Sequence, residues 1–230
     1  MMPFLLIPGL NCDSRVYGPA AATLWQFGPV TIASTIEGEG VAGLAETILA
    51  NAPPKFALGG FSMGGYIAFE ILRRAPERVL KLALIDTRAE ADTPESIELR
   101  RRRIALVRGG KFTLAVEQSF PDSVHADHVD DGDLYAIHRT MAEANGPEAY
   151  VRHQEAIIAR PDSRPLLSGI GVPTAVIVGE GDKITPPEAA ETMHHAIAGS
   201  VLAVIPRAGH LTLLEQPQLI GAALAAWARA

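Results

Sequence analysis

The segment 60–64 reads Gly-Phe-Ser-Met-Gly and matches the pattern G-x-S-x-G. It directly follows the apolar run 56–58 and opens an amphipathic run over 63–74, so we expect a strand, a tight turn and a helix in that order. Glycine suits both flanking positions because side chains there would clash in so tight a turn. This setting is typical of a nucleophile elbow, in which the Ser62 hydroxyl is exposed and can attack a carbonyl carbon. The alternative is a plain glycine-rich turn.

His210 is the expected general base, because a serine hydroxyl is a poor nucleophile at neutral pH unless a base accepts its proton. Of the seven histidines, only His210 lies in a glycine-containing loop just past a predicted strand, near the end of the sequence. The other six lie in a helical region described below or on the helix after Pro187, and we expect them to be solvated or packing residues: His125, His128, His138, His153, His194 and His195.

The acid that orients the histidine is expected after the apolar run 174–178. Asp182 stands four residues past this run, in a loop that the helix start at 185–187 closes. Glu180 is a nearby competitor and is expected to be a loop carboxylate. Asp86, at the end of the apolar run 79–85, is the other candidate for the acid. We favour Asp182 over Asp86.

An oxyanion needs preorganised hydrogen-bond donors. The backbone N–H of Met63, directly after the serine, is one candidate. The other is expected in the loop after the apolar run 4–7, where we choose the N–H of Leu10. The alternative is that this loop is only a turn. Cys12 follows in the same loop and has no base assigned to it, so we interpret it as a small packing residue.

Short apolar runs alternate with helical patterns along most of the chain. The runs are continuous and rich in Ile, Val and Leu, as expected of strands covered on both faces in a parallel sheet. They predict an α/β fold with a mostly parallel sheet of about six strands and helices on both faces. The expected strands are 4–7, 30–33, 56–58, 79–85, 174–178 and 201–205, and the expected helices are 41–50, 63–74, 187–197 and 219–228.

The region 87–168 breaks this alternation, because it shows helical patterns and no strand. We therefore predict a core of residues 1–86 and 169–230, with a helical lid of residues 87–168 inserted after the fourth strand. Such an insertion can cover the strand ends; the alternative is a packed subdomain with no gating role. Four consecutive arginines, 100–103, lie on its first helix. Most should face solvent, and one could turn inward to hold a substrate carboxylate.

The composition excludes several other classes of protein. The 230 residues carry a formal net charge of −6, which argues against a nucleic-acid partner. A single cysteine allows no internal disulfide and no thiolate metal cage. No signal peptide and no membrane helix is indicated, so we expect a cytoplasmic protein with no membrane partner. We also expect that its reaction needs no cofactor and no metal. The oligomeric state is not indicated.

Four motifs, in this order along the chain, resemble those of the α/β-hydrolase fold. They are Pro8-Gly9, the GFSMGG of 60–65, the GEGD of 179–182 with Thr185-Pro186, and Gly209-His210. The likeness is nearest to small lidded carboxylesterases and enol-lactonases. The sequence differs from many members of this family in having Pro8-Gly9 where they have His-Gly. It also starts at what resembles the family's third strand.

This resemblance implies a serine hydrolase that cleaves a carboxylic ester or lactone through an acyl-enzyme on a triad of Ser62, His210 and Asp182. Two alternatives remain open. One is a C–C bond hydrolase or lyase with the same triad, and the other is a ligand-binding receptor on the same fold. The expected partner is a small ester or lactone.

Overall fold

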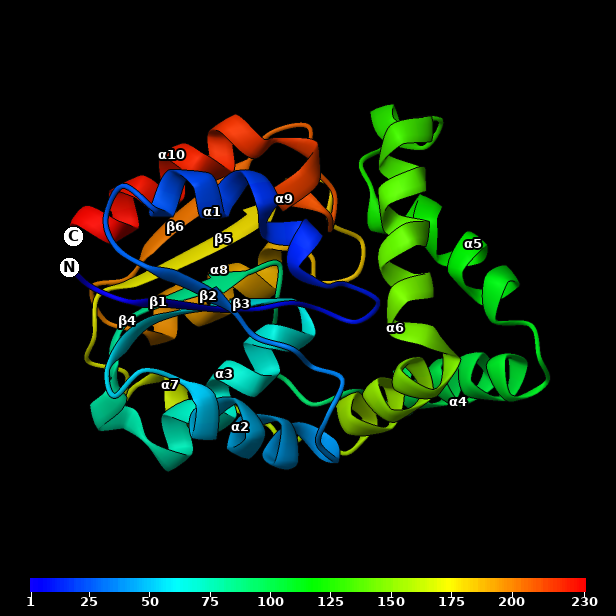
Figure 1. Cartoon of the computed structure of the whole chain (residues 1–230), viewed down its shortest axis with the longest axis horizontal. Coiled ribbons are helices and arrows are strands. Elements are labelled where there is room, and N and C mark those ends of the chain that lie inside the picture. The colour runs from blue at the N-terminus through cyan, green and yellow to red at the C-terminus, as the bar shows by residue number, and fades with distance from the viewer.

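A six-stranded parallel sheet forms the centre of the computed structural model, which describes residues 1–230 (Figure 1). The spatial order of the strands is β2-β1-β3-β4-β5-β6, and every neighbouring pair is parallel. Their carboxyl ends therefore lie along one edge of the sheet. The predicted fold class is confirmed. The strands are β1 (Phe4–Ile7), β2 (Val30–Ile32), β3 (Phe56–Phe61), β4 (Val79–Ile85), β5 (Thr174–Gly179) and β6 (Val201–Ile205).

Strand β3 runs three residues beyond its predicted end at residue 58, because its two glycines continue the pairing with β4 instead of ending the strand. Close packing requires glycine at position 60, where a Cβ would meet backbone, whereas at position 59 it would meet only the end of a side chain. A Cβ on Gly59 would lie 2.7 Å from Leu6 Cδ2, and one on Gly60 would lie 2.5 Å from the Gly64 carbonyl oxygen. The glycines that indicate a turn in the sequence thus let β3 extend to the residue before Ser62.

Helices cover both faces of the sheet (Figure 1). One face packs against α2 (Gly40–Asn51), α3 (Met63–Arg74) and α8 (Pro187–Ala196). The other packs against α1 (Gly18–Leu24) and α10 (Pro217–Arg229), which follows the single turn α9 (Thr212–Glu215). The two apolar clusters hold 27 and 24 buried residues, so neither face of the sheet is left to solvent, which explains the continuous apolar runs.

The sequence patterns did not indicate α1, a short helix that follows the turn η1 (Ser14–Tyr17). The turn η2 (Pro76–Arg78) connects α3 to β4.

Between β4 and β5 the chain forms helices and no strand. These are α4 (Pro94–Arg108), α5 (Phe112–Ser123), the turn η3 (Ala126–His128), α6 (Gly132–Ile158) and the short α7 (Arg164–Leu167). Helix α6 bends at Gly146, whose φ of 82° is not helical and which precedes Pro147. Helices α4, α5 and α6 stand together beyond the carboxyl edge of the sheet (Figure 1). None of the helices combines the length and the apolar character needed to cross a bilayer.

Candidate functional site

Ser62 lies in the turn between β3 and α3, with a φ of 54° and a ψ of −116°. This conformation is uncommon for a residue with a side chain and persists only where the surroundings impose it. Here the Ser62 N–H donates to the Ile85 carbonyl (2.9 Å), and the Thr87 hydroxyl donates to the Ser62 carbonyl (2.8 Å). A Cβ on Gly64 would lie 2.1 Å from the Ile7 carbonyl oxygen, so only glycine fits there. The turn has the geometry expected of a nucleophile elbow.

His210 stands directly opposite the serine, in the loop after β6. Its Nε2 is 2.8 Å from Ser62 Oγ, and its Nδ1 is 2.8 Å from Asp182 Oδ2. The imidazole is buried, with 6% of the residue exposed. With the ring proton on Nδ1, His210 donates to the carboxylate and Nε2 is free to accept the serine proton. The structure thus brings together the three residues that the sequence indicated from three distant motifs.

Asp182 is held by its own loop before it meets the histidine. Its Oδ1 accepts from the backbone N–H groups of Ile184 (2.8 Å) and Thr185 (2.9 Å), and its Oδ2 accepts from the Thr185 hydroxyl (2.6 Å). Burial by itself would raise the pKa of this carboxyl. The charge of His210 and these hydrogen bonds outweigh burial and hold the pKa of Asp182 below its ordinary value. Asp182 is therefore ionised beside the histidine.

Asp86 lies at the end of β4 with a φ of 43°, fully buried and close to Asp182, but it does not contact His210. Its Oδ1 accepts from the Gly179 N–H (2.9 Å), and its Oδ2 accepts from the Thr212 hydroxyl. Burial, followed by the negative charge of Asp182, raises the pKa of Asp86 well above its ordinary value. Of the two acids that the sequence left open, only Asp182 meets the imidazole.

The two candidate oxyanion donors flank the serine. Met63 is the first residue of α3, so its N–H has no partner within the helix. The Leu10 N–H donates to no protein acceptor, and Leu10 lines the same cavity as Ser62. The loop that carries it packs tightly on the elbow, since a Cβ on Gly9 would lie 2.9 Å from Ser62 Cβ. Both N–H groups are available to a ligand oxygen.

The cavity beside the serine has a volume of about 90 Å³. It is lined by the elbow and the His210 loop on one side and by residues of the inserted helices on the other, among them Arg100, Arg103, Ser119, His138, Tyr150 and Ile157. Burial lowers the pKa of the His138 imidazole to about 4, so this second histidine is neutral. Residues of α4, α5 and α6 thus form one wall of the cavity.

Glu215, on α9, takes part in a buried cluster that the sequence did not indicate. Its side chain is fully buried; Oε1 accepts from the Gly209 N–H (2.8 Å), and Oε2 accepts from the His125 N–H (2.7 Å) and lies 2.8 Å from His128 Nδ1. The carboxylate thus joins the loop that carries His210 to the inserted region. No local pattern around a single glutamate on a one-turn helix signals such a role, because its partners come from elsewhere in the chain.

Other residues considered from the sequence make no contact with the three residues of this site. Cys12 lines the cavity beside Ser62, but burial followed by the nearby Asp13 raises the pKa of its thiol to about 12, in keeping with a packing residue. His194 Nδ1 contacts the Ser200 hydroxyl at 2.8 Å, and Glu180 Oε2 accepts from the Arg207 N–H at 3.3 Å. No group of three His, Cys, Asp or Glu side chains is arranged to hold a metal ion.

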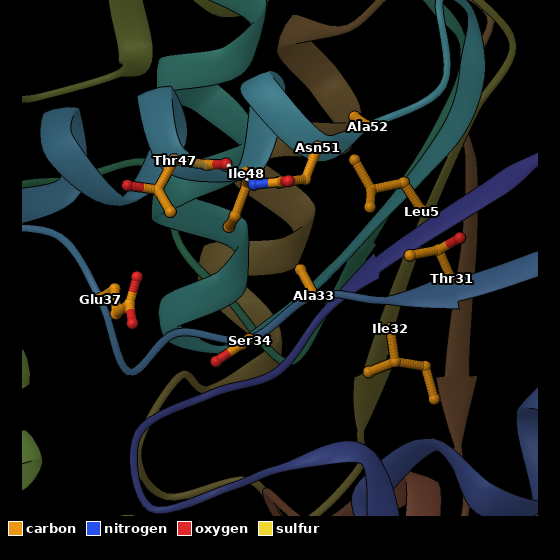
Figure 2. Close-up of a pocket in the computed structure, with 10 residues that line it drawn as sticks. All are labelled: Leu5, Thr31, Ile32, Ala33, Ser34, Glu37, Thr47, Ile48, Asn51 and Ala52. Atoms are coloured by element: carbon orange, nitrogen blue, oxygen red, sulfur yellow. Dashed lines mark hydrogen bonds between the residues drawn. The ribbon is translucent and has the colours of Figure 1, made fainter.

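A separate hollow of about 360 Å³ lies between the edge strand β2 and helix α2 (Figure 2). Its polar side chains include Glu37, Thr47 and Asn51, and Asn51 Nδ2 donates to the Thr47 carbonyl at 2.9 Å. It contains no histidine and no cysteine, and its one carboxylate, Glu37, is hydrogen-bonded to none of its hydroxyl groups. The cavity beside Ser62 is therefore the candidate active site.

Comparisons with known proteins agree with this architecture. A sequence model of the alpha/beta hydrolase family matches residues 5–223. A pimeloyl-[acyl-carrier protein] methyl ester esterase from Neisseria meningitidis is 29% identical over 196 residues, which cover 79% of this chain and 72% of the relative.

Two solved structures extend the likeness to the whole chain. A thermophilic esterase from Thermogutta terrifontis is 31% identical, with a TM-score of 0.90, over 100% of this chain and 90% of that chain. The enol-lactonase from Burkholderia xenovorans LB400 has a TM-score of 0.91 at 22% identity, over 100% of this chain and 92% of that chain, which is a likeness of fold alone.

Proposed function

The chain belongs to the α/β-hydrolase family and is a hydrolase, and we propose that it cleaves a carboxylic ester or lactone through an acyl-enzyme on Ser62. The observation that carries the proposal is the position of His210, whose ring nitrogens lie 2.8 Å from Ser62 Oγ and 2.8 Å from Asp182 Oδ2. A base that contacts both a hydroxyl and an ionised carboxylate is the arrangement that activates serine for acyl transfer. The names of the methyl ester esterase and the thermophilic esterase support an ester as the bond cleaved.

In the first half of the proposed reaction, Ser62 Oγ bonds to the carbonyl carbon while His210 Nε2 accepts the hydroxyl proton. The carbonyl oxygen becomes an oxyanion that accepts hydrogen bonds from the Leu10 and Met63 N–H groups. The bond between the carbonyl carbon and the alcohol oxygen then breaks, and the alcohol takes the proton from His210. The ionised Asp182 stabilises the imidazolium that exists between these two transfers.

In the second half, a water molecule attacks the acyl carbon and gives a proton to His210. The bond to Ser62 Oγ breaks, the serine recovers its proton, and the carboxylic acid leaves. With a lactone, the acid and the alcohol remain in one product. We propose that the region 87–168 acts as a lid, because its helices line the cavity. Closed over the acyl-enzyme, they would exclude bulk water.

The test is hydrolysis of p-nitrophenyl esters from acetate to octanoate by the wild-type protein and by Ser62→Ala. We expect turnover by the wild type and a loss on the order of 10⁶ in kcat in the variant, the size found for removal of a triad serine. Trapping of an acyl group on Ser62 by mass spectrometry would identify the intermediate. The chain-length optimum would measure the acyl pocket.

Equal rates in the two proteins would show that Ser62 is not the nucleophile. Absence of ester turnover in the folded wild type would overturn the esterase proposal. It would favour C–C bond cleavage or a lyase reaction with the same residues, or a ligand-binding role. Tight stabilisation by a ligand without turnover would separate the last of these from the others.

A further inference from the structure

Two of the four consecutive arginines on α4 turn toward the candidate active site. Arg100 and Arg103 are three residues apart, so they share one face of the helix. Both are half-buried and both line the cavity that contains Ser62. Arg101 and Arg102 are exposed, and Arg102 pairs with Glu98 at 3.1 Å. The run is therefore divided between a solvent face and a face that forms the wall of the site.

The inward arginines differ in their partners. Arg100 is already satisfied, because its Nε lies 2.5 Å from Asp92 Oδ2 and its Nη1 donates to Gln154 Oε1 at 2.7 Å. The guanidinium of Arg103 makes no hydrogen bond and no ion pair within the protein, although the side chain is half-buried. A charged group in this position has lost part of its hydration and has gained no acceptor in return.

The hydroxyl of Tyr150 is a second donor on the same wall. It accepts from Gln154 Nε2 at 2.9 Å, but no protein atom accepts its own proton. Tyr150 is buried, and burial raises the pKa of its hydroxyl although the charge of Arg103 lies near enough to oppose that rise. The hydroxyl is therefore protonated, and it lies near a guanidinium that also has no acceptor.

Positive side chains outnumber negative ones around this wall, unlike in the chain as a whole. No carboxylate is among the residues lining the cavity beside Ser62, although the protein as a whole has a net charge of −6. An adjoining hollow of about 370 Å³ shares Arg100 and Arg103 and adds Arg88 and Lys183, against Asp92 and Asp122. The approach to the serine is thus locally positive on an acidic molecule, which favours an anionic ligand.

We propose that the substrate is an ester or lactone that also carries a free carboxylate, which Arg103 binds through its guanidinium with the Tyr150 hydroxyl as a second donor. The ester carbonyl then lies at Ser62, and the carboxylate lies on the α4 side of the cavity. A planar guanidinium matches a carboxylate in a two-point hydrogen bond. The inference rests on the proposed function for its catalytic step, but the binding of a carboxylate can be measured without turnover.

The kinetic experiment compares the monomethyl esters of succinate, glutarate and adipate with neutral methyl esters of equal chain length. We expect the wild type to prefer the half-esters in kcat/KM. In Arg103→Gln this preference should fall about 10- to 100-fold, the range for losing a hydrogen-bonded charge partner. The preference should survive in Arg102→Gln, a matched control on the exposed face of the same helix. Persistence of the preference in Arg103→Gln, or its absence in the wild type, would overturn the proposal.

The binding experiment separates this inference from the proposed function. Succinate and glutarate should raise the melting temperature of the wild type and of Ser62→Ala, and should have a smaller effect on Arg103→Gln. An equal effect on Arg103→Gln would refute the carboxylate site even where esters are hydrolysed. A response to inorganic phosphate as large as that to glutarate, at equal ionic strength, would overturn the assignment to a carboxylate. A protein that binds glutarate through Arg103 but hydrolyses no ester would refute only the proposed function.

Discussion

At the scale of single residues, the site contains two buried carboxylates whose pKa values shift in opposite directions. Asp182 is held ionised by His210 and by donors in its own loop, whereas Asp86 is pushed toward its neutral form by burial and by the charge of Asp182. Two carboxylates this close do not both ionise readily. The structure thus assigns the negative charge to the residue that contacts the imidazole.

This division predicts unequal effects of two matched substitutions. Asp182→Asn removes the charge that stabilises the imidazolium and favours the wrong histidine tautomer, so kcat should fall about 10⁴-fold. Asp86→Asn keeps a neutral side chain and an oxygen that can accept from the Gly179 N–H, so kcat should fall far less. Steady-state kinetics of both variants on one ester make the comparison. The reverse ranking would transfer the orienting role to Asp86.

The raised pKa of Asp86 also predicts how stability depends on pH. A group whose pKa is higher in the folded state adds stability below its unfolded pKa, about 4, and loses that contribution as the pH rises toward the folded value. In Asp86→Asn the side chain at this position does not titrate, so the variant does not lose this contribution. The free energy of unfolding of the variant, relative to that of the wild type, should therefore increase as the pH rises above about 4. Urea unfolding of both proteins at pH 4.5 and pH 7.5 measures the difference. A difference that does not change with pH would contradict the assigned shift.

At the scale of elements, α9 connects the histidine loop to the inserted helices through Glu215. The backbone N–H groups of Gly209 and His125 each donate to one carboxylate oxygen of Glu215. In Glu215→Gln the amide NH₂ group replaces one of these oxygens, so one of the two backbone N–H groups would face another donor. Loss of a buried, hydrogen-bonded charge is expected to lower the free energy of unfolding by about 2–4 kcal/mol. Because the loop carries His210, kcat should also fall, with a smaller change in KM.

Glu143→Gln is the matched control for this prediction. Glu143 is exposed and pairs with Arg139 one turn earlier on α6, so its loss should change stability by less than about 1 kcal/mol. Chemical denaturation and ester kinetics on both variants complete the comparison. If Glu215→Gln is as stable and as active as Glu143→Gln, the cluster does not position the histidine.

The elements also show what the sequence can and cannot reveal. Continuous apolar runs predict the strands because both faces of the sheet are covered. Glycines and a serine in fixed spacing identify the elbow. Both signals are local in the sequence and can be found without the structure. The contacts of Glu215 with His125, and of Asp86 with Thr212, join residues far apart in the chain and follow no periodic pattern. Helix α5 includes Pro121, which usually marks a helix end, and was not indicated.

At the scale of the whole molecule, the inserted helices are fastened to the core at several separate places. Asn145 Nδ2 donates to the Cys12 carbonyl (3.1 Å), and His153 Nε2 lies 2.7 Å from the Thr35 carbonyl. On the other side, the Leu211 N–H donates to the Ser123 carbonyl at 2.9 Å. These contacts hold the helices against the core at separated points, so we expect motion that admits substrate to be confined to parts of the region 87–168.

This attachment predicts that the insertion and the core unfold in a single transition. The two tryptophans, the exposed Trp25 and the buried Trp227, both belong to residues 1–86 and 169–230, so tryptophan fluorescence reports on this part of the chain alone. Far-UV circular dichroism also reports on α4, α5 and α6. In a urea titration the two signals should give the same midpoint and the same slope, as expected for one cooperative unit. If circular dichroism is lost at a lower urea concentration than fluorescence, the insertion melts first, and a lid that opens as a body becomes the better description.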